Sequence, residues 1–449
     1  MKRRTVRRVL QLSVRRVWYP RWRRRVLFLV GGLAVGGAAV ALALLADRAQ
    51  LVFQTMQSRW PWAPFVVAPL GFGLSAWVTR RVFPGAQGSG IPQVMAARQL
   101  ASTAAREKLV SVRIAVGKVL LLLLGLACGA SVGREGPTVQ VGAAIMFALG
   151  RLSPQRQPGL LLAGSAAGIA AAFNAPLAGI IFGIEEMSRS FETRASGLVL
   201  GTVIAAGLTS LATLGDYTYF GSTPASLPIG PQWFAVLAAG VAGGFAGGAF
   251  SRILIAFGGG LRGVAGGWIR AYPVGFAVLC GLALALCGLA TGGQVFGTGY
   301  EQAQMILHGE DGLSPWFGPV KLLATAVSSI SGIPGGIFSP SLAVGAGIGQ
   351  DIGRALPGVP VGVLAVLCMA AYLTGVVQAP ITSFVIVSEM TENHALIIPI
   401  MLACLIANAC SKMICAEGVY QALALRFVGP RDELRGAGHT GELATKDPG

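Results

Sequence analysis

The sequence predicts an all-α polytopic membrane protein, and three observations lead to that fold class. Of its 449 residues, 54% are hydrophobic and only 12% are charged, whereas soluble domains carry about 25% charged residues. Apolar segments recur along the whole chain, beginning with a run over 26–46 that is long enough to cross a bilayer. Several later segments are shorter and are interrupted by Gly or Pro, which is typical of half-helices covered by other protein within the membrane.

The N-terminal region combines a basic arm with the first predicted span. Residues 1–25 are rich in Lys and Arg, and no acid precedes Asp47. Positive charge beside a first span keeps that side in the cytoplasm, so we expect a cytoplasmic arm over 1–25 in a multi-pass protein of the cell (inner) membrane. The net charge of +17 is then a topology signal and does not indicate nucleic-acid binding. We expect the membrane domain over 26–426 and a short cytoplasmic tail over 427–449.

The charges of the later loops agree with this orientation. The loop 98–113 is mainly basic, whereas the loops 213–230 and 298–317 contain acids and neither Lys nor Arg. The bias of basic residues toward the cytoplasm places the first loop inside and the other two outside.

The chain also contains an internal repeat. One set of residues recurs 203 positions later, namely Pro137, Gly142, Gly150 and Arg151 as Pro340, Gly345, Gly353 and Arg354. A second block, 175–187, recurs as 379–390 at offsets of 203–204, which pairs Glu186 with Glu389, although Glu389 itself reads as a helix end. We therefore expect two halves, roughly 26–215 and 231–426, of the kind that secondary transporters use to form a substrate site at the interface between repeats.

Three breaks in the apolar pattern share glycines followed by a proline that can open a helix. They are Gly88-Ser89-Gly90-Ile91-Pro92, Gly133-Arg134-Glu135-Gly136-Pro137 and Gly335-Gly336-Ile337-Phe338-Ser339-Pro340. Each helix start offers unpaired N–H groups and a positive dipole end. Three starts that converge would bind an anion without a full positive charge. A cation pathway would instead need carbonyls or rings of acids, and acids are scarce in this chain.

In order and spacing these breaks resemble the signatures of the CLC family of chloride channels and chloride/proton antiporters. Residues 173–179 and Tyr420 are similar to further family motifs, and the resemblance covers roughly 60–426. It implies a fold of about 18 mostly tilted or broken helices in two inverted repeats. It also implies a homodimer with one pathway per subunit. The residues after Tyr420 are too few for the CBS domains of many eukaryotic members, as in bacterial members.

The resemblance also implies roles for individual residues. The hydroxyls of Ser89 and Tyr420 and the backbone N–H groups of Ile337 and Phe338 would bind chloride. Glu135 would be the gate, because its carboxylate takes an anion position until protonation releases it. Glu186 would pass protons from the inside, which favours antiport. A passive voltage- or pH-gated chloride channel remains the alternative, and a fluoride-exporting relative is less favoured because the motifs around Ser89 and Glu135 are intact.

Chloride and protons are the expected substrates and the lipid bilayer is the expected surrounding, with no cofactor, no metal and no enzymatic activity. A remote alternative is an intramembrane serine hydrolase at Ser131, which lies in a Gly-x-Ser-x-Gly pattern but lacks a histidine within a predicted span. Glu185 reads as a solvated helix end, and the role of Lys118 is open. Gln93 and Met95 stand where some bacterial exchangers carry acids, so the inner proton entry is also open.

Overall fold

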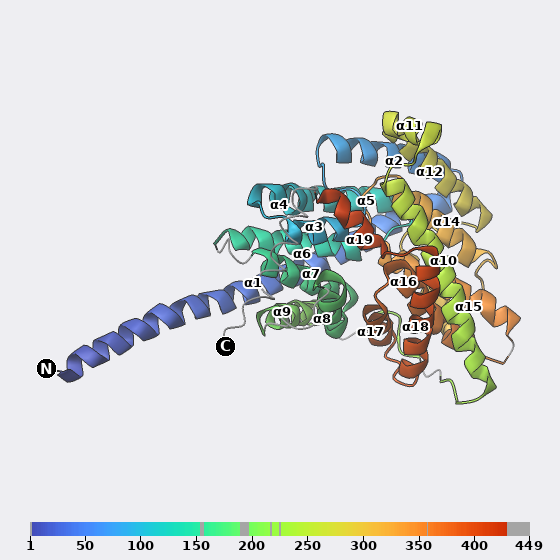
Figure 1. The fold of residues 1–449 in the computed structure, drawn as a ribbon. Coiled ribbons are helices and arrows are strands. Elements are labelled where there is room, and N and C mark those ends of the chain that lie inside the picture. The colour runs from blue at the N-terminus through green and yellow to red at the C-terminus, as the bar shows by residue number, and fades with distance from the viewer. Residues whose placement is uncertain are drawn as a thin grey trace.

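The structure is a computed structural model that describes residues 2–428 except 153–156, 189–196, 216–217, 224–225 and 357. Regular structure within these residues is helical, apart from two isolated bridges between backbone segments. Figure 1 shows the helices packed into one body from which the N-terminal part of α1 projects. The predicted all-α fold is confirmed. The predicted tail beyond residue 428 lies outside the described residues.

Six helical stretches in the described part of the chain are long and apolar enough to cross a membrane. The first is Arg25–Arg59, which is part of α1 (Lys2–Arg59), so the predicted basic arm is helical from Lys2 onward and continuous with the first span. The stretches are α1 (Lys2–Arg59), the successive helices α4 and α5 (Thr103–Val110 and Val112–Ala127), α9 (Gly197–Leu214), α10 (Phe234–Gly258), α12 (Pro273–Ala290) and α18 (Ile397–Ile414).

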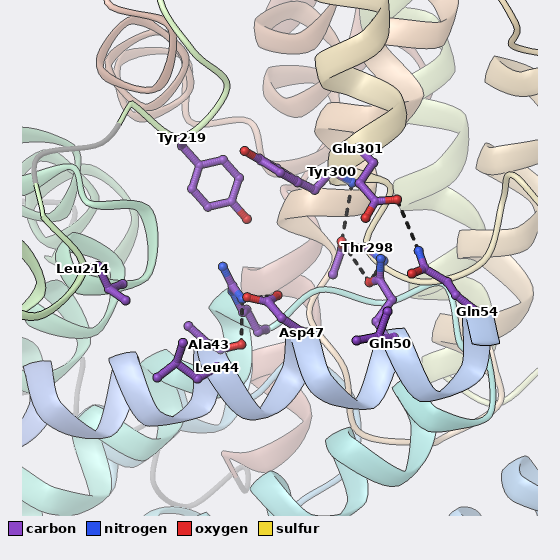
Figure 2. Close-up of a pocket in the computed structure, with 12 residues that line it drawn as sticks. Ala43, Leu44, Asp47, Gln50, Gln54, Leu214, Tyr219, Thr298, Tyr300 and Glu301 are labelled. Atoms are coloured by element: carbon purple, nitrogen blue, oxygen red, sulfur yellow. Dashed lines mark hydrogen bonds and ion pairs between the residues drawn. The ribbon is translucent and has the colours of Figure 1, made fainter. Parts of the chain in front are cut away.

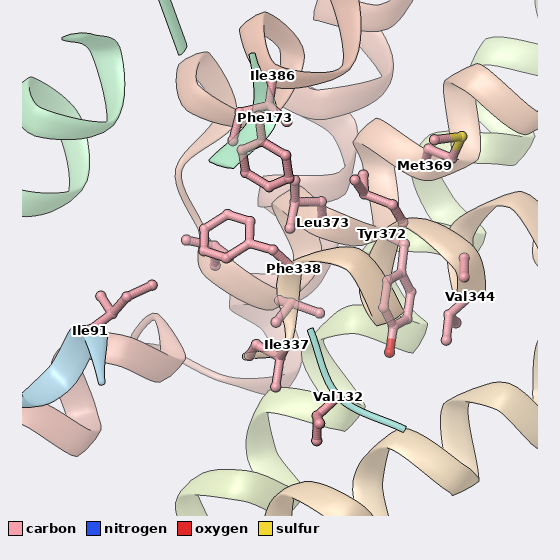
Figure 3. Packing of buried hydrophobic residues seen from close by; sticks show 14 of the residues in the cluster. Ile91, Val132, Phe173, Ile337, Phe338, Val344, Met369, Tyr372, Leu373 and Ile386 are labelled. Carbon is pink, nitrogen blue, oxygen red and sulfur yellow. The ribbon is translucent and has the colours of Figure 1, made fainter. Parts of the chain in front are cut away.

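The remaining α-helices are shorter or more deeply buried. They are α2 (Pro64–Arg81), α3 (Ile91–Gln99), α6 (Glu135–Leu149), α7 (Gln157–Phe173), α8 (Pro176–Phe182), α11 (Gly263–Ala271), α13 (Tyr300–His308), α14 (Phe317–Ile330), α15 (Phe338–Ala355), α16 (Val361–Val377), α17 (Pro380–Thr391) and α19 (Val419–Ala424). Helices α7 and α16 are apolar on all sides and almost wholly buried, as expected for helices at the centre of the fold. Figure 3 shows part of this core around Phe338 and Tyr372.

The two halves break their central helices in the same way. Helix α7 ends before Asn174, which has a φ of 52°, and α16 ends before Gln378, which has a φ of 60°. In both places an Ala-Pro pair follows, and the proline begins the next helix. A left-handed residue ends a helix and a proline is well suited to start one, so the local sequence explains both breaks.

Packing partners repeat in the two halves, which confirms the repeat. Helix α1 packs against α6, α7 and α9, and α10 packs against α15, α16 and α18. Helix α3 packs on α6, and likewise α13 packs on α15. Helix α5 packs against α2 and α6, and its counterpart α14 packs against α12 and α15.

Two glutamates join the halves reciprocally. Glu185 accepts hydrogen bonds from the N–H groups of Ile381 and Thr382 at 3.1 and 2.6 Å, at the start of α17. Glu389 accepts from the N–H groups of residues 177 and 178 at 3.1 and 2.6 Å, at the start of α8. Because each contact has its counterpart 204 positions away, the halves are related by a local two-fold axis.

These contacts correct two of our expectations from the sequence. Glu185 is not a solvated helix end, because both carboxylate oxygens bind the other half. In these contacts the repeat counterpart of Glu389 is Glu185, not Glu186, because the bonded residues 177 and 178 correspond to 381 and 382 at the same offset of 204. Carboxylates are favourable beside the positive end of a helix, and a sequence does not reveal that the helix concerned belongs to the other half.

Candidate ion-transport site

The three glycine-rich breaks meet at one point. Gly133 and Gly336 exchange two N–H···O bonds of 2.8 Å, so the local two-fold axis that relates the halves passes between these two residues. Gly88 donates to the carbonyl of Ile333 at 3.1 Å and accepts from the N–H of Gly335 at 3.0 Å. The three breaks therefore converge, and backbone hydrogen bonds fix their contact.

Glycine is required where the breaks approach each other. A Cβ atom on Gly136 would lie 2.3 Å from the Ser89 hydroxyl oxygen, and one on Gly90 would lie 2.7 Å from the side-chain oxygen of Gln140. Gly90 also has a φ of 99°, which disfavours other residues. The first two breaks can therefore approach each other only because these positions carry no side chain.

Helix starts surround this point. Helices α3, α6 and α15 begin at Ile91, Glu135 and Phe338, each within one of the breaks. The first N–H groups of a helix have no acceptor within it, and they carry a partial positive charge. The arrangement therefore offers an anion several N–H donors and a favourable field.

Glu135 is fully buried at the start of α6. Its carboxylate accepts a hydrogen bond from the hydroxyl of Ser339 and lies 3.4 Å from the backbone N of that residue, at the start of α15. Arg134 instead faces α1, where its Nη1 atom donates to Asp47 Oδ1 at 2.7 Å and to the carbonyl of Ala43 at 3.0 Å. The carboxylate of Glu135 thus occupies a site built for an anion, and Arg134 is paired with another acid.

A cavity of about 490 Å³ lies on the side of Arg134; we call it the Asp47 cavity. Figure 2 shows Asp47 and Gln50 on α1 facing Tyr219, Tyr300 and Glu301 across it. Asp47 is exposed at this cavity, and sequence reasoning missed it. The available signal was that it is the first acid of the chain and lies in an apolar helix.

A second cavity, of about 440 Å³, lies on the other side of the breaks; we call it the Tyr420 cavity. Ser89, Ile337 and Tyr420 line it. The hydroxyls of Ser89 and Tyr420 interact electrostatically, yet both are buried and neither has a partner of good hydrogen-bond geometry among the described residues. Phe338 stacks on Tyr420 with ring centres 5.9 Å apart. The four residues expected to bind the anion therefore lie together.

Two lysines hold the backbone near these cavities. Lys118 is fully buried, and its Nζ donates to the carbonyls of Gln87 at 3.2 Å and Gly88 at 2.7 Å. Its side chain therefore supports the first break. Lys321, which is 203 positions later, donates to the carbonyls of Val295 and Gly297 at 2.8 Å each. Sequence reasoning missed Lys321, although the repeat offset was the signal that pointed to it.

The segment supported by Lys321 is the counterpart of the first break. Gly297 and Gly299 have positive φ, as Gly88 and Gly90 do, and α13 begins at the next residue. Thr298 stands in the place of Ser89 but lines the Asp47 cavity, where its N–H donates to Gln50 Oε1 at 3.2 Å. Counterparts on opposite sides of the breaks show that the two halves are inverted.

Glu186 is buried in the π-helical turn Gly183–Ser188 that follows α8. The charges of Glu135 and Glu186 both contribute to the electrostatic surroundings of Tyr420. Gln93 donates to the carbonyls of residues 85 and 87, and Met95 is buried. Neither of these last two residues has an ionisable proton.

Among the described residues, other hydroxyl groups surround Ser131. Its hydroxyl lies 3.0 Å from that of Thr325, and its N–H donates to Ser328 at 3.1 Å. His308 and His394 are exposed, and His439 lies outside the described residues. The hydroxyl that a hydrolase would need as a nucleophile is part of the packing between the halves.

Comparison with known proteins identifies the family. The sequence profile described as "Voltage gated chloride channel" matches residues 71–412. The chain is 31% identical over 422 residues to the H(+)/Cl(-) exchange transporter ClcA of Yersinia pseudotuberculosis, with 88% of this chain and 83% of that protein covered. It is 29% identical to the ClcA of Klebsiella pneumoniae, with 88% and 84% covered. The chain belongs to the CLC family of voltage-gated chloride channels and transporters.

Solved structures show the same fold. A slow cyanobacterial Cl-/H+ antiporter aligns with a TM-score of 0.77 at 24% identity, covering 90% of this chain and 97% of that one. A CLC-type fluoride/proton antiporter aligns with a TM-score of 0.75 at 20% identity, covering 91% and 99%. The predicted CLC-type fold is confirmed, and the choice of anion is not decided by the fold.

Proposed function

We propose that this protein exchanges chloride for protons across the membrane. The observation that carries the proposal is the buried carboxylate of Glu135 at the point where three helix starts converge. An anionic side chain that occupies an anion site competes with any anion that enters it. The ClcA relatives are named as H(+)/Cl(-) exchangers, which supports the same choice of ions.

The mechanism is a competition that protonation decides. While Glu135 is ionised, it accepts hydrogen bonds from the start of α15 and closes the path. Protonation removes the charge that the helix starts attract, so the side chain leaves and chloride takes its place. The hydroxyls of Ser89 and Tyr420 and the N–H groups of Ile337 and Phe338 bind chloride as it enters from the Tyr420 cavity.

Glu186 supplies protons from the inside in this proposal. Its burial in the turn after α8 and its electrostatic interaction with Tyr420, which lines the Tyr420 cavity, support this role. Phe338 packs against Tyr420 and also against Phe182, which directly precedes the turn that carries Glu186. A proton crosses such an apolar region only with the help of transient water, so proton transfer is expected to be slower than chloride entry.

Reconstitution into liposomes tests the proposal. A chloride gradient should drive protons uphill, and a proton gradient should drive chloride. Chloride flux without any proton movement would replace antiport with the passive channel. A fluoride gradient of the same size is the control for the anion, and proton movement driven by fluoride alone would assign the protein to the fluoride-exporting type.

The sidedness follows from the charges of the chain. If the basic N-terminus lies on the cytoplasmic side of the inner membrane, α1 runs outward and Asp47 lies toward the outer side. We therefore take the Asp47 cavity as the outer one and the Tyr420 cavity, which Arg80 and Arg426 also line, as the inner one. A reporter that works only in the cytoplasm should be active when it is fused before residue 1. Activity of a reporter that works only in the periplasm, fused at the same place, would reverse the assignment.

A homodimer with one pathway per subunit completes the proposal. Helices α8, α9, α17 and α18 lie together along the lower side of the molecule in Figure 1, and they pack pairwise. Large apolar side chains on α9 and α18 are exposed there, namely Leu200, Ile204, Leu208, Leu211, Ile398, Leu402 and Leu405. Light scattering of the protein in detergent should give twice the monomer mass, and Ile204→Trp should shift it to the monomer.

A further inference from the structure

The hydroxyl of Ser339 distinguishes the third break from a purely backbone anion site. Ser339 is buried near the start of α15 and donates its hydroxyl proton to the carboxylate of Glu135. Its backbone N lies 3.4 Å from the second carboxylate oxygen. One residue of the second half therefore contacts both oxygens of the group that closes the path in the first half.

A second hydroxyl continues this contact toward the outside. The Tyr219 hydroxyl lies 3.5 Å from that of Ser339. The Ser339 hydroxyl already donates its only hydrogen in the hydrogen bond to Glu135. In the pair with Tyr219 its oxygen is therefore the acceptor, and the Tyr219 hydroxyl is the donor. Tyr219 also lines the Asp47 cavity, and Figure 2 shows its hydroxyl pointing into that cavity. The order from the cavity inward is thus Tyr219, Ser339, Glu135.

The ring of Tyr219 is held firmly, so its hydroxyl has a defined place. It packs edge-on against Phe173, Phe220 and Tyr300, with ring centres 5.9, 5.1 and 5.0 Å apart. Phe173 in turn packs against Phe338, the neighbour of Ser339, at 5.9 Å. The aromatic cluster therefore sets the position of both hydroxyls relative to Glu135.

The ionisable groups around Glu135 come from several helices. Arg134 on its own helix pairs with Asp47 of α1, and Tyr420 of α19 lies on the side of the inner cavity. Several other charged side chains of the helices that pack on α6, and of the turn that follows α6, have partners of their own. They are Lys118 with the carbonyls of 87 and 88, Arg98 with Ser188, Arg106 with Gln157, Arg151 with Glu107, and Arg354 with Asp351.

We propose that Ser339 is a positioning residue that holds ionised Glu135 in the closed state, and that Tyr219 and Ser339 together carry protons between Glu135 and the Asp47 cavity. In the inward step, water in the cavity gives a proton to Tyr219, Tyr219 gives its own to Ser339, and Ser339 gives its own to Glu135. Each hydroxyl has then gained one proton and lost another, so both are neutral again, and each O–H group points in the opposite direction along the chain. The proposal rests on Glu135 acting as the gate.

The test compares chloride and proton fluxes in liposomes as the outer pH is varied. Ser339→Ala removes a hydrogen bond that favours the ionised carboxylate, so Glu135 is protonated at lower proton concentration. The pH of half-maximal chloride flux should rise by about one unit, a tenfold change equivalent to about 1.4 kcal/mol. Ser339→Thr keeps a hydroxyl and should restore the wild-type profile. Tyr219→Phe keeps the ring and should lower proton flux relative to chloride flux by at least about threefold.

A matched control lies on the same helix. Ser341 is fully buried in α15, and no partner of its hydroxyl is found among the described residues, so Ser341→Ala makes the same chemical change away from Glu135. Equal shifts in the Ser339 and Ser341 variants would mean a structural effect and would overturn the proposal. Wild-type profiles in both Ser339→Ala and Tyr219→Phe would overturn it as well. Wild-type protein that moves chloride without protons would instead refute the antiport, and the pH midpoint of Ser339→Ala would still test the positioning role.

Discussion

The break that opens α6 and the break that opens α15 are bonded to each other through Gly133 and Gly336, yet they carry different side chains. In the first break Glu135 lies two residues after Gly133, and the equivalent residue of the other break, 203 positions later, is Phe338. Both residues begin a helix, and both are buried at the same junction. The scaffold is therefore duplicated, whereas the ionisable group occurs in only one copy.

The same difference appears at two other pairs of positions. Ser89 presents a buried hydroxyl to the Tyr420 cavity, whereas its counterpart Thr298 contacts Gln50 of α1. Glu186 has Met390 as its counterpart at the offset of 204. The first half thus carries both buried acids and the Ser89 hydroxyl, whereas the second half supplies the Ser339 and Tyr420 hydroxyls together with matching backbone and packing. A transporter built from inverted halves needs such asymmetry, because two equal gates would bind the ion equally from both sides.

The strongest test of this asymmetry is Glu135→Gln. The wild-type chloride flux should rise as pH falls, because protonation removes the carboxylate that competes with chloride. The amide is neutral at every pH, so the variant should transport chloride at a rate independent of pH and should move no protons. Chloride efflux and pH change in liposomes measure both quantities. A variant with wild-type pH dependence would show that another group is the gate.

Glu186→Gln should have the next largest effect. Proton flux should fall at least about tenfold, because the amide cannot donate a proton, while chloride flux stays within about twofold. Glu417→Gln is the control, since this acid is exposed in the loop before α19. Unchanged coupling in Glu186→Gln would place the inner proton donor elsewhere.

Ser89→Ala and Thr298→Ala compare the two corresponding hydroxyls. Loss of a hydrogen bond to an ion costs about 1.5–3 kcal/mol, so Ser89→Ala should weaken chloride binding by about tenfold or more. Thr298→Ala should change it less than about twofold, because Thr298 contacts a side chain of the protein. Isothermal titration of chloride in detergent measures both. Equal effects would mean that the outer copy also binds the ion.

The smallest effects are expected at the reciprocal glutamates. Glu185→Ala and Glu389→Ala each leave two N–H groups at a helix start without a partner, and each should lower the stability by about 2 kcal/mol. Similar losses of melting temperature would confirm that the two contacts are equivalent. Only Glu185→Ala should also reduce proton flux, because its turn carries Glu186 whereas Glu389 precedes Met390. Reduced coupling in both variants would contradict the division of roles between the halves.

Features set by local sequence could be predicted. The breaks at Gly88, Gly133 and Gly335 were recognisable because glycines and prolines dictate backbone conformation where they stand. Their convergence could be expected since all three belong to one compact membrane domain. The repeat offset relates Lys321 to Lys118, but the partners of both lysines were not predictable, because a buried ammonium donates to any nearby carbonyl and the sequence does not say which one is near.

By itself the sequence determined the membrane class and the repeat, and its resemblance to the CLC family predicted which residues bind the anion. Hydrophobic length and glycine-proline breaks act over a few residues, so they can be read along the chain. Only the tertiary structure decided that Glu185 binds the start of α17, that Arg134 turns to Asp47, and that Ser339 contacts Glu135. These contacts join residues from about 90 to about 200 positions apart, and their existence depends on how the two halves pack against each other.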